Sequence, residues 1–330
     1  MTSTIKWGIL GTSFISQLMA DAIVAEGQST VHSIAGRSPG ALEAFARKNS
    51  IESVFSDFDA LLEDPAVDVV YIALPNHIHH DYVCRAAAAG KAIVCEKSLS
   101  IDMEKTDLSL AAVSENGVFF LEGLMYLCHP VVDTIVDILH SGIIGDVKSV
   151  HGDYCAAISQ FVNPLSMGVL FNLGCYPVSL MHLVMQCAYG DDIFDDVSVQ
   201  AVGRFGDDGN VCETSAVFSF ANGVQANIHA AEDYGLYSSF RVLGSAGSLE
   251  LLTNPWLPEA SGGQIRVTPY DCASEVIDVP AAGDGFYYQV KRVREMLEQG
   301  ALEVQRPAVR PKDSRAIMAL LSAWTAALPG

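Results

Sequence analysis

The chain has 330 residues, with 39 acidic and 19 basic side chains and a formal net charge of −20 at pH 7. This excess of negative charge opposes the counterion release that draws proteins to nucleic acid, so we expect no nucleic-acid partner. Hydrophobic residues make up 50% of the chain, which is enough to fill the cores of two domains. There is no apolar run of roughly 18 residues, and the chain does not open with a charged segment followed by an apolar one. We therefore expect a cytoplasmic two-domain protein with no membrane partner.

The first 26 residues predict a strand, a tight turn and a helix. Residues 5–10 suit a buried strand, Gly11-Thr12-Ser13 suits a turn, and apolar residues recur at helical spacing over residues 14–26. Small residues in such a turn let backbone N–H groups and a helix N-terminus approach a pyrophosphate. Ser13 and Ser16 stand where the second and third glycines of G-x-G-x-x-G would fall, so the motif is a weak signal by itself.

The next predicted strand, residues 31–35, ends in Gly36-Arg37-Ser38. A site that prefers NAD usually places an acidic residue here to accept the ribose hydroxyls, whereas an arginine and a serine suit a 2′-phosphate. Arg37 and Ser38 therefore predict NADP(H) rather than NAD(H). The alternative interpretation of Arg37 is a solvated side chain at a strand end.

Strands and helices alternate through the rest of the first half. Residues 69–74, 92–95 and 118–121 are predicted strands, and residues 78–89 and 102–115 are predicted helices. Such alternation indicates a parallel sheet that is covered on both faces.

The segment Glu96-Lys97-Ser98 is the most informative in the chain. It directly follows one of these strands, at the sheet edge where ligands of open α/β sheets bind. A lysine there can contact both a cofactor and a substrate hydroxyl. Taken alone, Lys97 would more often be a solvated lysine at the end of a strand.

The pattern changes after a predicted helix at residues 130–140. Successive strands are predicted at residues 147–156, 197–205, 214–220, 225–231 and 239–243, and helices at residues 286–299 and 311–327. We therefore predict an α/β protein, with an N-terminal Rossmann dinucleotide-binding domain over residues 1–123 and a C-terminal α+β domain with a large, mostly antiparallel sheet over residues 124–330. The last helix can pack back on the first domain. An open face of the second sheet suits a homodimer or a homotetramer.

No metal site is predicted. The eight cysteines contain no C-x-x-C pair and are expected to be buried free thiols. His77, His79 and His80 lack a paired Cys/His spacing, and they begin a helix on which His79 can face the cofactor.

Several segments together carry a family resemblance that extends over nearly the whole chain. They are Trp7-Gly8-Ile9-Leu10-Gly11-Thr12, Leu74-Pro75-Asn76-His77-Ile78-His79, Glu96-Lys97, Glu122-Gly123-Leu124-Met125-Tyr126 with His129-Pro130, and Asn172-Leu173-Gly174-Cys175-Tyr176-Pro177. This combination resembles the glucose-fructose oxidoreductase/inositol dehydrogenase (Gfo/Idh/MocA) family, and within it the branch of dimeric dihydrodiol dehydrogenases, NADP-dependent xylose dehydrogenases and sugar ketoreductases. The resemblance implies a Rossmann domain and a second domain whose sheet forms the floor of the substrate pocket and often an oligomer interface.

The resemblance also implies roles for individual residues. Lys97 maps to the lysine that binds the nicotinamide ribose and the reacting oxygen, and Tyr176 maps to the acid/base position. We expect cofactor contacts from Gly11, Thr12, Ser13, Phe14, Ile15, Arg37, Ser38, Leu74, Pro75, Asn76, His79, Glu96 and Lys97. We expect substrate contacts from Asn172, Met125, Tyr126, Tyr154 and Tyr234, although Tyr154 and Tyr234 suit an oligomer interface equally well.

Three positions depart from the family pattern. Asn172 stands where aspartate is usual, and an amide cannot relay a proton by ionising, so a role in orienting a substrate hydroxyl is favoured. Ser98 replaces a common proline, which removes a fixed φ angle beside Lys97. Leu127 replaces a frequent arginine, and losing that cation favours a neutral substrate.

The chemistry can be argued from residue types alone. Hydride transfer at a carbinol carbon is assisted by an acid/base near the attached oxygen and by a cation that stabilises alkoxide character. Tyr176 and Lys97 supply these two groups. Together with the ordered set of motifs that carries the family resemblance, this chemistry leads us to expect an NADP(H)-dependent oxidoreductase acting on a neutral sugar, ketosugar, polyol or diol. The alternative is a closed-cycle NAD(P)-dependent glycosidase or a non-catalytic dinucleotide- or sugar-binding sensor, which the departures at Ser98 and Asn172 favour.

Overall fold

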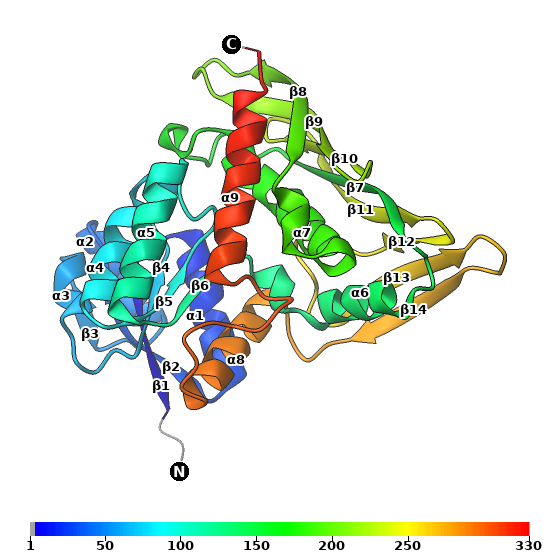
Figure 1. The fold of residues 1–330 in the computed structure, drawn as a ribbon. Helices are drawn as coiled ribbons and strands as arrows, with labels where there is room; N and C mark the ends of the chain where they lie inside the picture. Colours follow the sequence, from blue (N-terminus) through cyan, green and yellow to red (C-terminus); the bar gives the residue numbers. More distant parts are fainter. Residues whose placement is uncertain (1–3, 330) are drawn as a thin grey trace. The chain divides into compact units, whose positions relative to one another are not determined.

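The computed structural model describes residues 4–329, and their contacts divide into two compact units (Figure 1). The first unit contains the described residues up to Met125 together with Phe286–Arg315. The second contains Tyr126–Gly285 and the described residues from Ala316 onward. The structure thus groups residues 286–315 with the N-terminal part of the chain, whereas the sequence assigned everything from residue 124 to the second domain.

The first unit is built on a six-stranded parallel sheet in the order β3-β2-β1-β4-β5-β6. Its strands are β1 (Ile5–Leu10), β2 (Ser29–Ala35), β3 (Ser53–Phe55), β4 (Val69–Ile72), β5 (Ala92–Cys95) and β6 (Phe120–Glu122). Its helices are α1 (Phe14–Glu26), α2 (Pro39–Lys48), α3 (Phe58–Leu62), α4 (His79–Ala88) and α5 (Met103–Asn116), with a short 3₁₀ turn η1 (Asn76–Ile78) before α4. Helix α8 (Gly285–Glu298) contributes all but its first residue, and α9 (Pro311–Ala326) begins here and continues in the second unit.

This strand order confirms the predicted Rossmann fold. Trp7–Leu10 and all of β4 are buried, as expected for strands that are covered on both faces. The order of the strands reverses between β1 and β4, and ligands of open α/β sheets bind outside the carboxyl ends of the strands at such a point. The turns that follow β1, β4 and β5 are therefore where a cofactor is expected.

The second unit is built on an eight-stranded sheet in the order β14-β13-β12-β11-β7-β10-β9-β8. Within the described chain its paired strands run antiparallel except for β7 and β10, which confirms the mostly antiparallel sheet. The strands are β7 (Val147–Ala156), β8 (Val197–Phe205), β9 (Val211–Phe220), β10 (Gln225–Ala231), β11 (Leu236–Gly244), β12 (Gly247–Leu251), β13 (Gly262–Pro269) and β14 (Glu275–Pro280). The other elements are η2 (Met125–Cys128, the first residue in the first unit), α6 (Pro130–Ser141), η3 (Pro164–Ser166), a π-helical turn η4 (Leu170–Gly174), α7 (Cys175–Tyr189) and η5 (Asp191–Phe194).

The two faces of this sheet differ in chemistry. We call the face that carries Asp153, His229 and Ser215, which lie in register across β7, β10 and β9, the outer face. The opposite, inner face carries Tyr154 and Phe218 and packs against α7. A Cβ atom on Gly152 of β7 would lie 2.9 Å from Cβ of Pro177, so the absence of a side chain there lets α7 approach the inner face closely.

Helices α2, α3 and α7 and strands β3, β12, β13 and β14 were not predicted. Residues Cys175–Gln186 of α7 are all buried, so this mostly apolar helix has no exposed polar face, and a mostly apolar run is hard to assign to a helix or a strand from its periodicity. The eight cysteines are free thiols as predicted, although Cys272 is exposed and Cys84 and Cys187 are only partly buried. Among residues 4–329, no helix combines the length and the apolar composition needed to cross a membrane.

Candidate functional site

The turn after β1 has the shape of a phosphate-binding turn. Gly11 has a φ angle of 104°, and a Cβ atom there would lie 2.6 Å from the carbonyl oxygen of Ala73, so other residues are excluded on both grounds. The backbone N–H of Ser13 donates to Oγ of Ser16 over 3.2 Å, which closes the first turn of α1. The two serines that replace glycines therefore cap the helix and preserve the turn.

The N-terminus of α1 is suited to an anion. No acidic residue lies in the first turn of this helix, so its N–H groups and dipole act without a competing carboxylate. Thr12 and Ile15 are partly exposed beside it, and Phe14 is 78% exposed. The residues present thus fit a dinucleotide pyrophosphate with an apolar surface next to it.

Two basic side chains lie near each other beyond β2 and β4. Arg37 and Ser38 are exposed after β2, and Ser38 is the N-cap residue of α2. Arg37 makes no ion pair with a carboxylate in the part of the chain that the structure describes. The pKa of His77 is lowered, first by burial and then by the charge of Arg37. The positive charge at this edge is therefore not neutralised by the protein.

Lys97 follows β5 in a segment that is anchored by buried polar groups. Glu96 is 6% exposed, and its carboxylate accepts a hydrogen bond of 2.5 Å from the hydroxyl of Tyr71 and one of 3.3 Å from the backbone N–H of Lys97. Burial raises the pKa of Glu96, while the Tyr71 hydroxyl and the charge of Lys97 oppose that rise. The peptide bond between Lys97 and Ser98 is cis.

A second buried carboxylate holds the other side of this segment. Glu122, at the end of β6, accepts a hydrogen bond of 2.9 Å from the backbone N–H of Leu99. Burial raises the pKa of Glu122 to about 7. Roles for Tyr71 and Glu122 were not predicted from the sequence. A polar residue inside an otherwise aliphatic strand is the signal that could have found them.

His79 links the turns that follow β4 and β5. It is completely buried, with Nε2 lying 2.6 Å from the carbonyl oxygen of Leu74 and Nδ1 lying 3.0 Å from that of Ser98. Burial lowers the pKa of His79 to about 4, while the carbonyl oxygens of Leu74 and Ser98 oppose that shift. Leu74 and Asn76 are buried beside it and Pro75 is partly exposed. Within the first unit, the structure thus gathers the turns predicted to bind the cofactor at one edge of the sheet.

In the second unit, Tyr176 lies in the first turn of α7 and is 7% exposed. Its carbonyl oxygen accepts hydrogen bonds from the hydroxyl of Tyr126 (3.0 Å) and from that of Ser179 (2.9 Å). Tyr126 is itself completely buried, and its hydroxyl lies 2.7 Å from Oγ of Ser179. These contacts fix the backbone that carries the Tyr176 phenol.

An aromatic cluster surrounds the ring of Tyr176. Ring centroids lie 5.3 Å away in Tyr154, 5.8 Å away in Tyr126 and 6.4 Å away in Trp256. Trp256 is completely buried and donates from Nε1 to the carbonyl oxygen of Asp153 over 3.0 Å. Burial raises the pKa of Tyr154 to about 12, so this phenol gives up its proton less readily than an ordinary tyrosine. The supporting role of Trp256 was not predicted.

Asn172 lies in η4, four residues before Tyr176. Its side-chain amide donates from Nδ2 to Oε2 of Glu232 over 2.7 Å. Glu232 follows β10 directly and is only 4% exposed. The sequence analysis did not select Glu232. Met125, another proposed substrate contact, is 3% exposed. Leu127, which stands where the family frequently has arginine, is also buried.

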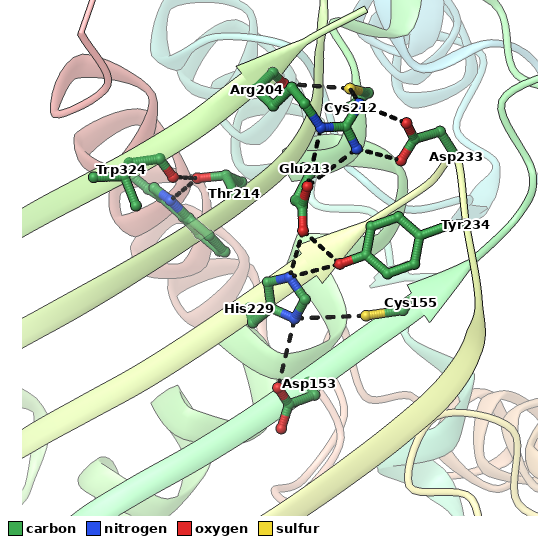
Figure 2. A network of polar contacts seen from close by, with 11 residues as sticks. Asp153, Cys155, Arg204, Cys212, Glu213, Thr214, His229, Asp233, Tyr234 and Trp324 are labelled. Carbon is green, nitrogen blue, oxygen red and sulfur yellow. Dashed lines mark hydrogen bonds and ion pairs between the residues drawn. The ribbon is translucent and has the colours of Figure 1, made fainter.

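Tyr234 does not belong to the aromatic cluster around Tyr176. It belongs to a polar network on the outer face of the second sheet (Figure 2), where its hydroxyl donates to Glu213 and lies 3.4 Å from Nε2 of His229. His229 lies between two carboxylates, 3.6 Å from Asp153 and 3.5 Å from Glu213. Arg204 extends the network by pairing with Glu213 and Asp233. Among the described residues, no three His, Cys, Asp or Glu side chains form a group that could hold a metal ion.

The network makes stability depend on pH. The carboxylate of Asp153, 3.6 Å away, raises the pKa of His229 above 6.5, so the folded-state contribution of His229 is complete below pH 6.5 and is lost as the pH rises through the raised value. His229→Gln should lower the free energy of unfolding by about 1 kcal/mol near pH 6 and by less near pH 9, measured by thermal or urea unfolding. His151→Gln on the same face is the control, because burial lowers the pKa of His151 and its difference from wild type should not shrink at high pH. A His229→Gln difference that is equal at both pH values would contradict the prediction.

Comparisons with known proteins agree with both folds. Residues 5–124 match a sequence model of the oxidoreductase family with an NAD-binding Rossmann fold (GFO/IDH/MocA), and residues 132–250 match the GFO/IDH/MocA C-terminal domain. An uncharacterised oxidoreductase of Rhizobium meliloti, ORF334, is 33% identical over 261 residues, which is 77% of this chain and 76% of that protein. A trans-1,2-dihydrobenzene-1,2-diol dehydrogenase of Sus scrofa is 26% identical over 91% of this chain and 90% of its own length.

A solved structure is similar over almost the entire chain. It is that of KijD10, a 3-ketoreductase from Actinomadura kijaniata, in complex with NADP and TDP-benzene. It superposes with a TM-score of 0.85 at 25% identity and covers 98% of both chains. With family matches in both units and a relative of 33% identity, the chain belongs to the GFO/IDH/MocA family of oxidoreductases.

Proposed function

We propose that the protein is an NADP(H)-dependent oxidoreductase that transfers hydride between the nicotinamide and a carbinol or carbonyl carbon of a neutral sugar, ketosugar, polyol or diol. The observation that carries this proposal is the arrangement at one edge of the first sheet. Gly11, Arg37 and Lys97 there follow strands β1, β2 and β5 of the same parallel sheet. A tight anion-binding turn, an unpaired cation and a lysine are the groups that a phosphorylated dinucleotide and a reacting hydroxyl require.

The residues have separate tasks in this proposal. The nicotinamide, when bound, supplies or accepts the hydride. Lys97 binds the nicotinamide ribose and the reacting oxygen, and its positive charge stabilises alkoxide character on that oxygen. The hydroxyl of Tyr176 exchanges the proton with the same oxygen. Glu96, Glu122 and His79 hold the segment that carries Lys97, while Tyr126, Ser179 and Trp256 hold Tyr176.

The preference for NADP(H) rests on Arg37. Its charge has no carboxylate partner among the described residues and lies near His77, so a 2′-phosphate would add the missing anion. Arg37→Ala should raise KM for NADPH by about tenfold or more and change KM for NADH by less than about twofold. Arg47→Ala is the matched control, because Arg47 is an exposed arginine of α2 that already pairs with Glu43 at 2.7 Å. An equal effect on both cofactors would contradict the assignment.

A neutral polyhydroxylated or diol substrate is supported by the relatives and by one residue. The related proteins include a dihydrodiol dehydrogenase and a 3-ketoreductase. Leu127 is buried in η2, so this position offers no cation to a substrate phosphate or carboxylate. Asn172, four residues before Tyr176, and its partner Glu232 instead offer an amide and a carboxylate, which suit substrate hydroxyls.

Nicotinamide absorbance tests the proposal directly. Purified protein is mixed with NADP(H) or NAD(H) and a panel of aldoses, ketosugars, polyols and aromatic diols. We expect a substrate-dependent change in absorbance, larger with NADP(H) at equal concentration. No change with any substrate, despite tight cofactor binding, would contradict the oxidoreductase reaction and favour a sensor. Sugar cleavage without release of the cofactor would favour the closed-cycle glycosidase.

We also propose that the protein forms a homodimer or homotetramer through the outer face of the second sheet. A cavity of about 960 Å³ opens over this face and is lined by residues of six adjacent strands. Val202 and Tyr237 on this face are 69% and 59% exposed beside the charged network of Figure 2. Sedimentation at equilibrium measures the state. A monomer at micromolar concentration would contradict the proposal.

A further inference from the structure

We propose that Glu232 is a positioning residue that fixes the orientation of the Asn172 side-chain amide, so that Oδ1 of Asn172 accepts a hydrogen bond from a substrate hydroxyl next to the reacting carbon. This inference deepens the proposed function and depends on it. In this chain the carboxylate that contacts the side chain of residue 172 comes from Glu232, directly after β10. It also predicts which substrates are selected, namely those with a hydroxyl vicinal to the reacting carbon.

The contact itself determines the orientation of the amide. A carboxylate only accepts hydrogen bonds, so the group of Asn172 that faces Oε2 of Glu232 at 2.7 Å has to be the NH₂ group. The carbonyl oxygen Oδ1 then points away from Glu232. A carbonyl oxygen has two lone pairs and accepts up to two hydrogen bonds, so a substrate hydroxyl can bind there in addition to a protein donor.

The backbone holds Glu232 rigidly in place. Its carbonyl oxygen accepts hydrogen bonds from the N–H groups of Ile158 (2.8 Å) and Ser159 (2.9 Å), and its N–H donates to the carbonyl oxygen of Cys212 (2.9 Å). The segment after β7 and strand β9 therefore both hold the backbone of Glu232 at the end of β10. With 4% of its surface exposed, its carboxylate needs partners such as the Asn172 amide, because a buried charge without hydrogen bonds is costly.

The position of Asn172 connects this pair to the reaction. Asn172 lies in the π-helical turn Leu170–Gly174, which runs directly into α7, and Tyr176 is the second residue of α7. π-helical turns are rare and occur frequently at functional sites. The Asn172 amide and the proposed acid/base Tyr176 are therefore carried by the same stretch of backbone. A shift of that backbone at Asn172 would also displace Tyr176.

The test is an exchange of charge and amide between the two positions. Three variants are compared with wild type: Glu232→Gln, Asn172→Asp, and the double variant Asn172→Asp with Glu232→Gln. In the Glu232→Gln variant, the Asn172 side-chain amide can adopt either of its two orientations. The value of kcat/KM for the best substrate should therefore fall by about tenfold. Asn172→Asp places two carboxylates at hydrogen-bond distance, so one pKa rises and activity should be lost as the pH increases through it. The double variant again pairs one amide with one carboxylate and should recover at least tenfold over Asn172→Asp.

A control variant, a cofactor titration and a substrate analogue separate a positioning role from an effect on general stability. Asp278→Asn is the matched control, because Asp278 of β14 accepts from the Gln264 amide of β13 over the same 2.7 Å but at an exposed site. It should leave kcat/KM and the pH profile unchanged. Titration of protein fluorescence with NADPH should give the wild-type Kd in all variants. A substrate analogue that lacks the vicinal hydroxyl should lose activity with wild type and lose no further activity with Glu232→Gln.

The outcomes distinguish this inference from the proposed function. A wild type with no substrate-dependent hydride transfer overturns both. An active wild type whose Glu232→Gln variant retains full kcat/KM overturns only the role of Glu232. A double variant no more active than Asn172→Asp, with an unchanged unfolding temperature, also overturns it, because pairing of amide and carboxylate would then not matter.

Discussion

Replacing Tyr176 by phenylalanine is expected to lower kcat by about 10²- to 10⁴-fold, the range typical for the loss of a positioned acid/base. The substitution removes only the hydroxyl. The hydrogen bonds that the Tyr176 carbonyl accepts from Tyr126 and Ser179 and the ring contacts with Tyr154 and Trp256 do not involve that atom. We therefore expect turnover to fall while the unfolding temperature stays within a few degrees of wild type.

Tyr189→Phe is the matched control for this experiment. Tyr189 is the last residue of the same helix, and its hydroxyl donates to the carbonyl oxygen of Val147 over 2.6 Å. Removing that hydroxyl should cost about 1 kcal/mol of stability and leave kcat unchanged. Steady-state kinetics with NADPH as the varied and then the saturating reactant gives kcat and KM separately. If Tyr176→Phe turns over at a rate near that of wild type, the tyrosine is not the acid/base.

The second large effect is expected for Lys97→Met. Methionine keeps much of the length of lysine but has no charge, so stabilisation of the developing alkoxide is lost and kcat/KM should fall by about 10²- to 10³-fold. The effect should not depend on unfolding, because the partners that fix this segment, Glu96 and Glu122, bond to backbone N–H groups of Lys97 and Leu99. Binding of NADPH should weaken as well, since Lys97 is assigned to the nicotinamide ribose.

Lys48→Met controls for the removal of one positive charge from the first unit. Lys48 is exposed in the last turn of α2 and should be replaceable without loss of turnover. Pre-steady-state measurement of hydride transfer separates the two tasks of Lys97. A variant that binds NADPH more weakly but transfers hydride at the wild-type rate would restrict Lys97 to cofactor binding and would contradict its role at the reacting oxygen.

The sequence by itself determined the ligand-binding edge of the first sheet. Strands Ile5–Leu10 and Ala92–Cys95 and helix Phe14–Glu26 have the bounds that their apolar patterns predicted. The reason is physical: a parallel strand that is buried on both faces is a continuous apolar run, and the residue that follows it lies at the carboxyl edge of the sheet. Gly11, Arg37 and Lys97 could therefore be placed at that edge without coordinates.

Only the tertiary structure decided which polar groups meet in the second unit. The sequence left the same two locations open for Tyr154 and Tyr234, namely the substrate pocket and an oligomer interface. Alternation along β7 directs Tyr154 to the inner face with Tyr176, whereas hydrogen bonds to Glu213 and His229 hold Tyr234 on the outer face. Glu232 meets Asn172 across 60 residues of sequence. Such pairs depend on strand order and on which face each residue occupies, and local sequence patterns specify neither.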